Sequence, residues 1–147
     1  KIGAYLADAP AEDAEKLYEF GVKMGLAFQL QDDWLDVYGD PKVFGKNIGG
    51  DILCNKKTFM LITALEEANE EQRAALEGWL AAREYVPAEK IAAVTALYNE
   101  IGVGKRCQEM AEALNAEGFA ILDSINLPEE RKAVLKKYAC SMLNRNV

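Results

Sequence analysis

The stretch from residue 11 to residue 38 constrains the fold most, because its apolar residues recur at helical spacing almost from end to end. Leu17, Phe20, Met24 and Phe28 follow one another at intervals of three or four, as on the buried face of a helix. No segment of the chain has the sustained alternation of apolar and polar residues that a half-buried strand shows. The sequence therefore predicts an all-α protein, a helical bundle.

Shorter helical patterns flank this long one and are separated from it by proline and glycine. Pro10 ends the first pattern, and the glycine-rich stretch 39–51 predicts a loop. The other expected helices cover residues 1–9, 51–68, 71–83, 88–101, 105–122 and 129–144. With no internal repeat or low-complexity linker, we expect one helical domain over residues 1–147. The chain starts at Lys1 within a helical pattern, so we expect it to be a piece of a longer protein.

An acidic stripe occupies the end of the long helix. With Asp32 at zero on the helical wheel, Asp36 falls near about 40°, Gln29 near about 60° and Asp33 near about 100°. Carboxylates this close repel one another, so we expect Asp33→Asn to stabilise the metal-free chain slightly. The apolar neighbours indicate a helix packed into protein, and a hard cation held through oxygen, Mg²⁺ first, would stabilise the stripe. The alternative is a solvated acidic face.

Charge and cysteine content exclude several classes of function. The formal net charge of −7 leaves no broad cationic surface for a nucleic-acid backbone, so no nucleic acid is expected as a partner. There is no histidine, and the three cysteines lie far apart, which argues against a zinc site or a disulfide framework and favours a cytoplasmic location. No apolar run approaches the roughly 18 residues of a membrane span, so no transmembrane segment is expected.

Lysines follow the acidic stripe closely in the sequence. Lys46 lies in the glycine-rich loop, and Lys56 and Lys57 lie shortly after it. The loop itself fits neither an EF-hand nor a P-loop, because its spacing and residue types depart from both. Carboxylates that hold Mg²⁺ together with nearby lysines are typical of a site for a diphosphate, because the metal and the ammonium groups share its negative charge.

Three linked motifs carry a resemblance to a known family. They are Phe28-Gln-Leu-Gln-Asp32-Asp33-Trp-Leu-Asp36, Gly45-Lys46-x-x-Gly49-x-Asp51-Ile52 and Asn55-Lys56-Lys57-Thr58. In this order they closely resemble the second aspartate-rich region of the trans-isoprenyl diphosphate synthases, or polyprenyl synthetases. The rest of the chain resembles this family only in its helical pattern.

The resemblance implies a fold, a reaction and site residues. The fold would be an isoprenoid-synthase helical bundle around a deep cavity, usually in a homodimer. The reaction would ionise an allylic diphosphate with the help of Mg²⁺ and condense it with isopentenyl diphosphate. By resemblance, Asp32, Asp33 and Asp36 would bind the metal, with Asp32 as the first candidate for a direct ligand. Lys46 and Lys56 would be catalytic and contact the allylic diphosphate, Phe28 and Gln29 would line the substrate pocket, and Asp51 would support the metal ligands.

One departure from the family changes the expectation for this chain. The family carries a first DDxxD motif on another helix, and this sequence lacks it. We therefore expect a C-terminal portion of a polyprenyl synthase domain that is inactive by itself. The alternative is a non-catalytic helical module that binds Mg²⁺ and diphosphate or serves as the partner subunit of a synthase.

Overall fold

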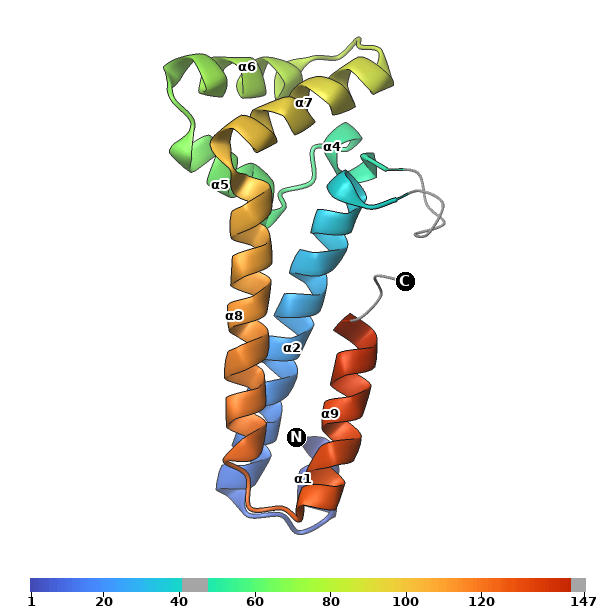
Figure 1. Cartoon of the computed structure of the whole chain (residues 1–147), viewed down its shortest axis with the longest axis vertical. Coiled ribbons are helices and arrows are strands. Elements are labelled where there is room, and N and C mark those ends of the chain that lie inside the picture. Colours follow the sequence, from blue (N-terminus) through green and yellow to red (C-terminus); the bar gives the residue numbers. More distant parts are fainter. Residues whose placement is uncertain (41–47, 144–147) are drawn as a thin grey trace. The chain divides into compact units, whose positions relative to one another are not determined.

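The computed structural model describes residues 1–40 and 48–143, and all the regular secondary structure in these ranges is helical. The helices are α1 (Ile2–Leu6), α2 (Ala11–Tyr38), α4 (Gly50–Leu53), α5 (Phe59–Glu67), α6 (Glu70–Ala81), α7 (Pro87–Ile101), α8 (Val103–Asp123) and α9 (Glu129–Leu143) (Figure 1). The prediction of an all-α fold is confirmed. No helix among the described residues is both long and apolar enough to cross a membrane.

The chain forms two compact units, which are described here one at a time. The first comprises residues 1–29 and 110–147 and contains α1, most of α2, the second part of α8, and α9. Its core joins three helices through buried apolar side chains: Phe20, Met24, Leu122, Ile125 and Ala139. Gly118 lets α8 approach α2 closely, because a Cβ atom there would lie 3.0 Å from the Met24 sulfur.

The second unit comprises residues 30–109: the end of α2, the helices α4 to α7 and the beginning of α8. Helix α7 packs against α4, α5 and α6 (Figure 1). Its buried Val94 and Tyr98 share a core with Val37 of α2 and Met60 of α5. The single domain predicted for residues 1–147 stays a prediction.

The prediction of one helix over residues 51–68 is wrong, because two helices with an irregular turn between them occupy this stretch. Helix α4 ends at Leu53 and α5 begins at Phe59. Asn55 takes the left-handed conformation, with φ of 53°, which a continuing helix does not allow. Thr58 then caps α5, since its hydroxyl accepts a hydrogen bond from the Leu61 N–H at 3.2 Å. The other predicted helices of the described residues occur, with ends shifted by a few residues.

Candidate functional site

The last two turns of α2 carry the acidic stripe of the second unit. Asp33 is buried, with 5% of its surface exposed, while Asp32 and Asp36 are half-buried. Leu35 and Val37 anchor this end of the helix through their burial. The apolar neighbours thus hold three carboxylates at the end of a packed helix, as the sequence predicts.

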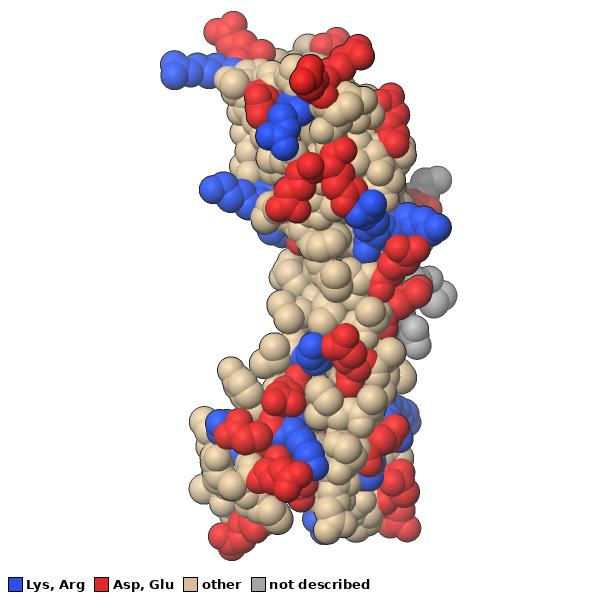
Figure 2. Space-filling model, turned by 90° about the vertical axis from the view of Figure 1, so that its left-hand side faces the viewer, with Lys and Arg blue, Asp and Glu red and all other residues tan. Residues whose placement is uncertain are grey.

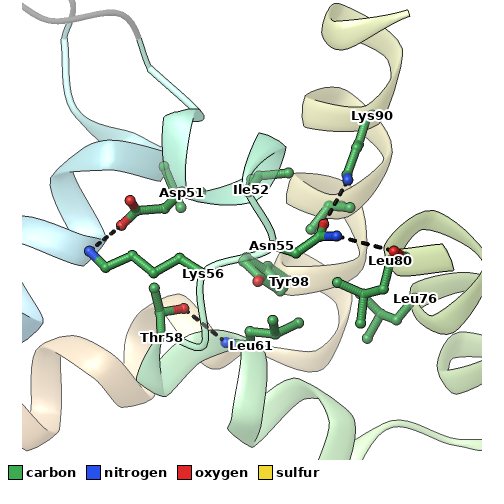
Figure 3. Close-up of a pocket in the computed structure, with 12 residues that line it drawn as sticks. Asp51, Ile52, Asn55, Lys56, Thr58, Leu61, Leu76, Leu80, Lys90 and Tyr98 are labelled. Carbon is green, nitrogen blue, oxygen red and sulfur yellow. Dashed lines mark hydrogen bonds and ion pairs between the residues drawn. The ribbon is translucent and has the colours of Figure 1, made fainter. Parts of the chain in front are cut away.

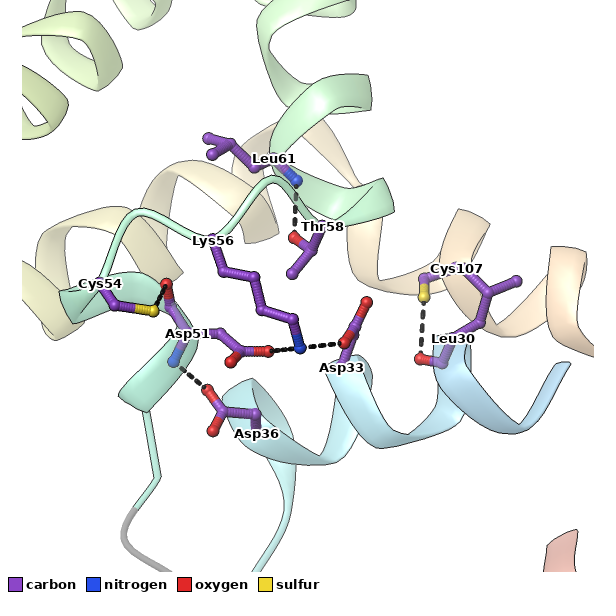
Figure 4. Close-up of polar contacts among 9 residues, drawn as sticks. All are labelled: Leu30, Asp33, Asp36, Asp51, Cys54, Lys56, Thr58, Leu61 and Cys107. Atoms are coloured by element: carbon purple, nitrogen blue, oxygen red, sulfur yellow. Dashed lines mark hydrogen bonds and ion pairs between the residues drawn. The ribbon is translucent and has the colours of Figure 1, made fainter. Parts of the chain in front are cut away.

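Lys56 lies between two of the carboxylates of the site (Figure 4). Its Nζ donates hydrogen bonds to Asp33 Oδ1 and to Asp51 Oδ2, each at 2.8 Å. The side chain of Lys56 is 41% exposed, whereas those of Asp33 and Asp51 are 6% and 20% exposed. These two hydrogen-bonded carboxylates raise the pKa of Lys56 above its usual range, so it stays a cation.

Asp36 joins the end of α2 to the beginning of α4. Its Oδ2 accepts a hydrogen bond from the Asp51 backbone N–H at 2.9 Å (Figure 4), and its backbone carbonyl accepts one from the Gly49 N–H at 2.6 Å. Burial raises the pKa of Asp36, and the negative charges of Asp51 and Asp32 add to this effect. The hydrogen bond from the Asp51 N–H and the positive charge of Lys56 act on the pKa of Asp36 in the opposite direction.

A small cavity lies next to Lys56 and Asp51, and Figure 3 shows residues that line it. Its volume is about 10 Å³, room for roughly one water molecule. At its inner end the Lys90 Nζ donates to Asn55 Oδ1 at 2.7 Å, and the Asn55 Nδ2 donates to the Leu80 carbonyl at 3.1 Å. Lys90 and Asn55 thus belong to the wall that adjoins the Lys56 cluster.

The burial of Lys90 is not expected from its residue type. A lysine in α7 reads as a solvated residue, yet only 1% of its surface is exposed. The spacing contains a signal, because Lys90, Val94 and Tyr98 follow one another at intervals of four and therefore share one helix face. Both Val94 and Tyr98 are buried. A lysine in register with them is expected on the buried face.

Some of the predicted site residues are not part of the cluster that Lys56 forms with the aspartates. Phe28, half-buried, and Gln29, exposed, belong to the first unit, while Lys56 and the three aspartates belong to the second. Lys46 lies outside the described residues. In the described part of the chain no three side chains of aspartate, glutamate or cysteine converge as a preformed metal cage. The metal-binding, substrate-binding and catalytic roles stay predictions.

In the described part of the chain, Lys56 supplies positive charge directly to the acidic stripe. Lys56 donates to Asp33 and Asp51, and Asp36 accepts from the Asp51 backbone N–H, so these contacts join the end of α2 to α4. Elsewhere, the surface displayed in Figure 2 intersperses acidic with basic side chains. A polyanionic ligand would therefore need cations beyond those of this cluster.

Comparison with known proteins identifies the family. Residues 1–101 match the polyprenyl synthetase family. The chain is 36% identical over 133 residues to a geranylgeranyl diphosphate synthase of Mycobacterium tuberculosis, covering 87% of this chain and 37% of that protein. It is 32% identical over 150 residues to a (2E,6E)-farnesyl diphosphate synthase of Mycobacterium bovis, covering 99% of this chain and 41% of the relative.

A solved structure gives the same answer. The crystal structure of a geranylgeranyl pyrophosphate synthase from Corynebacterium glutamicum, complexed with isoprenyl diphosphate and magnesium, matches with a TM-score of 0.83 and 32% identity. The match covers 97% of this chain and 40% of the other. This chain thus spans less than half the length of these relatives. On the family match and the structural likeness together, the chain belongs to the polyprenyl synthetase family.

Proposed function

We propose that this chain carries the second aspartate-rich part of the diphosphate site of a prenyltransferase. The complete enzyme would condense isopentenyl diphosphate with an allylic diphosphate and would use Mg²⁺. Membership in the polyprenyl synthetase family supports the reaction class. The observation that carries the proposal for this chain is the position of Lys56, held by Asp33 and Asp51 at 2.8 Å each while its side chain is 41% exposed.

The donor set of the cluster fits Mg²⁺. Carboxylate oxygens are ligands that Mg²⁺ prefers, and it is commonly held by one or two carboxylates with water and substrate phosphates completing its shell. Burial is the main cause of the raised pKa of Asp36, and the charges of Asp51 and Asp32 make smaller contributions, which a cation would offset. The described residues contain no preformed metal cage. This agrees with a site in which phosphate oxygens complete the shell of the metal ion. Asp32, Asp33 and Asp36 would hold the ion, which when bound would stabilise charge on the departing diphosphate.

Lys56 would bind the diphosphate directly. An ammonium group has three N–H donors. Asp33 and Asp51 accept two of them, and the Lys56 side chain is 41% exposed, so the third donor would be available to a phosphate oxygen. The two carboxylates also keep the ammonium protonated, so Lys56 would stabilise negative charge as the bond to the leaving diphosphate breaks. Lys46, Phe28 and Gln29 are proposed to complete the substrate contacts on the strength of the resemblance.

Calorimetric titration of the chain with inorganic pyrophosphate tests the proposal. We expect binding that depends on Mg²⁺ and that weakens about tenfold in Lys56→Met and in Asp32→Asn, since each removes one charged contact. Lys57→Met is the matched control, because Lys57 is the neighbouring lysine and is exposed. Equal effects of Lys56→Met and Lys57→Met, or binding that is indifferent to Mg²⁺, would contradict the proposal. Circular dichroism would check that each variant keeps its helix content.

Activity of the chain by itself gives a second test. We expect no prenyl product when the chain is mixed with both diphosphate substrates and Mg²⁺, because it carries only one of the family's two aspartate-rich motifs. Chromatographic analysis of the reaction would show this. Product above a metal-free control would refute the assignment of a partial site.

We propose for the complete enzyme the homodimeric assembly and the cytoplasmic location that the resemblance implies. Three large apolar side chains of the first unit are exposed: Ile2, Leu6 and Val134, with exposed fractions of 79%, 83% and 68%. An assembly that covers them would remove this apolar surface from water, which supports the dimer. Light scattering of the complete enzyme would measure its mass. A monomer at micromolar concentration would contradict the dimer.

A further inference from the structure

Lys90 is a buried cation in the interior of the second unit. Only 1% of its surface is exposed, and among the described residues it makes no ion pair with a carboxylate. Its Nζ donates to Asn55 Oδ1 at 2.7 Å and lies 4.4 Å from the centre of the Tyr85 ring. Burying an ammonium group is unfavourable unless polar partners replace water. The contact with Asn55 is therefore an important polar compensation for placing Lys90 in the core.

Asn55 is fixed at both ends of its amide. The oxygen accepts from Lys90, and the nitrogen donates to the Leu80 carbonyl at 3.1 Å at the end of α6 (Figure 3). Its backbone has φ of 53°, a conformation that asparagine and glycine tolerate better than other residues. Through its side chain, Asn55 thus ties the turn between α4 and α5 to α6 and α7.

Lys56 follows Asn55 in the chain and extends to the opposite side of this turn (Figure 3). Its backbone N–H donates to the Asp51 carbonyl at 2.9 Å, and its carbonyl accepts from the Thr58 N–H at 2.8 Å. Because the two residues are adjacent, a rotation of the backbone at Asn55 would turn Lys56 away from Asp33 and Asp51.

We propose that Lys90 is a positioning residue of the diphosphate site: by its hydrogen bond to Asn55 it holds the turn in the conformation that places Lys56 between Asp33 and Asp51. The inference rests on the proposed role of Lys56 at the diphosphate. It differs from a packing role, since the effect of Lys90 is transmitted through one hydrogen bond to one turn. A packing role would lower stability without a particular effect on Lys56.

The direct test measures the environment of Lys56 without any ligand. The chain is acylated briefly with an amine-reactive ester, and peptide mass spectrometry gives the labelling of Lys56 relative to the exposed Lys57 beside it. In the unsubstituted chain we expect Lys56 to be the slower, because two carboxylates hold its ammonium group. In Lys90→Met, which keeps the length of the side chain without its charge, we expect the ratio to rise several-fold.

Val94→Ala is the matched control for packing. Val94 lies one turn along α7, is 4% exposed and lines the same cavity, but its side chain cannot hydrogen-bond to Asn55. We expect this variant to lower the unfolding midpoint and to leave the labelling ratio unchanged. An unchanged ratio in Lys90→Met, or an equal rise in Val94→Ala, would overturn the proposal.

Asn55→Gly provides a second variant should Lys90→Met fail to fold. Glycine tolerates the positive φ at this position but removes the acceptor and the donor of the side chain. We expect a rise in the ratio at least as large as in Lys90→Met, because the bond to Leu80 is lost as well. Adding Lys90→Met should cause no further rise, because the bond between Lys90 and Asn55 is already absent. Separate and additive rises would overturn the proposal.

Pyrophosphate affinity links the positioning to the proposed function. With Mg²⁺ present, we expect Lys90→Met to bind pyrophosphate about tenfold more weakly, the order of effect of residues that orient a binding group. In a chain that already carries Lys56→Met, it should have no further effect, and an undiminished effect there would overturn the proposal. If the unsubstituted chain does not bind pyrophosphate, the proposed function fails, while the labelling ratio still decides whether Lys90 positions Lys56.

Discussion

Replacing Asp33 by asparagine isolates the effect of one buried charge in the acidic cluster. The sequence predicts a small gain in stability, because the substitution relieves repulsion among three neighbouring aspartates. The structure predicts the opposite sign. Asp33 is 5% exposed and accepts a hydrogen bond from the Lys56 ammonium at 2.8 Å, so its charge is paired. We therefore expect Asp33→Asn to lower the free energy of unfolding of the metal-free chain at neutral pH.

The geometry limits the size of this loss. Ion pairs at the surface contribute about 0.2 to 1 kcal/mol. Breaking a fully buried pair costs about 3 to 5 kcal/mol, because a buried charge is left without a partner. Here the Lys56 side chain is 41% exposed and keeps Asp51 as a partner, and the asparagine oxygen can still accept from it. The loss should be about 1 kcal/mol, near the upper end of the surface range, which corresponds to about 2 to 4 °C in melting temperature.

A double-mutant cycle with Lys56→Met tests the reasoning. Urea unfolding, followed by circular dichroism without metal, would measure all four proteins. In the Lys56→Met background the ammonium that pairs with Asp33 is gone. The loss on Asp33→Asn should then be clearly smaller than in the unsubstituted chain. A gain in stability in the unsubstituted chain, or the same loss in both backgrounds, would refute the pairing of Asp33 with Lys56.

Two further predictions use matched pairs. The pKa of Asp36 is raised on folding, so the folded chain binds this proton more tightly and its stability rises as pH falls through the folded pKa. Asp36→Asn should therefore raise the urea midpoint relative to the unsubstituted chain at neutral pH, opposite to Asp33→Asn, and lose this advantage below about pH 4. Gly49→Ala should lower the melting temperature more than Gly102→Ala: both glycines have positive φ, but only at Gly49 would a Cβ atom lie 2.7 Å from the Ile91 side chain. Equal losses in calorimetry would contradict the steric argument.

Most of the fold is predictable because its helices obey local rules. The long helix α2 has its predicted bounds, and Gly102 ends α7 in the left-handed conformation, with φ of 84°. The Phe59 to Leu65 spacing in α5 is also helical as predicted. These features depend on residues a few positions apart, which periodicity detects directly.

The position of the acidic stripe is predictable for the same reason, but the partners of its charged side chains are not. Residues 32, 33 and 36 lie near one another because they share two turns of a helix. The partner of Asp33 is Lys56, 23 residues further on, and nothing in the local pattern gives the direction of that side chain. The structure leads to the opposite expectation for Asp33→Asn, because the prediction from the sequence counts only the charges of one helix and the structure adds Lys56.

The break between α4 and α5 shows why the direction of the Lys56 side chain is not predictable from the local pattern, although the resemblance names this residue. In one continuous helix over 51–68, Lys56 would lie one turn after Ile52 and share its face, which is buried. The break turns the lysine away from that face, and long-range contacts stabilise it: Asn55 bonds to Leu80 and Lys90, 25 and 35 residues further along the chain. A local pattern cannot contain these partners. Prediction from the local pattern therefore fails at the turn between α4 and α5, which presents Lys56. Functional sites are the places where a chain is expected to depart from local preference. The motif Asn55-Lys56-Lys57-Thr58 ends at residue 58. It therefore omits Lys90, the side chain on which, by our proposal, the direction of Lys56 depends.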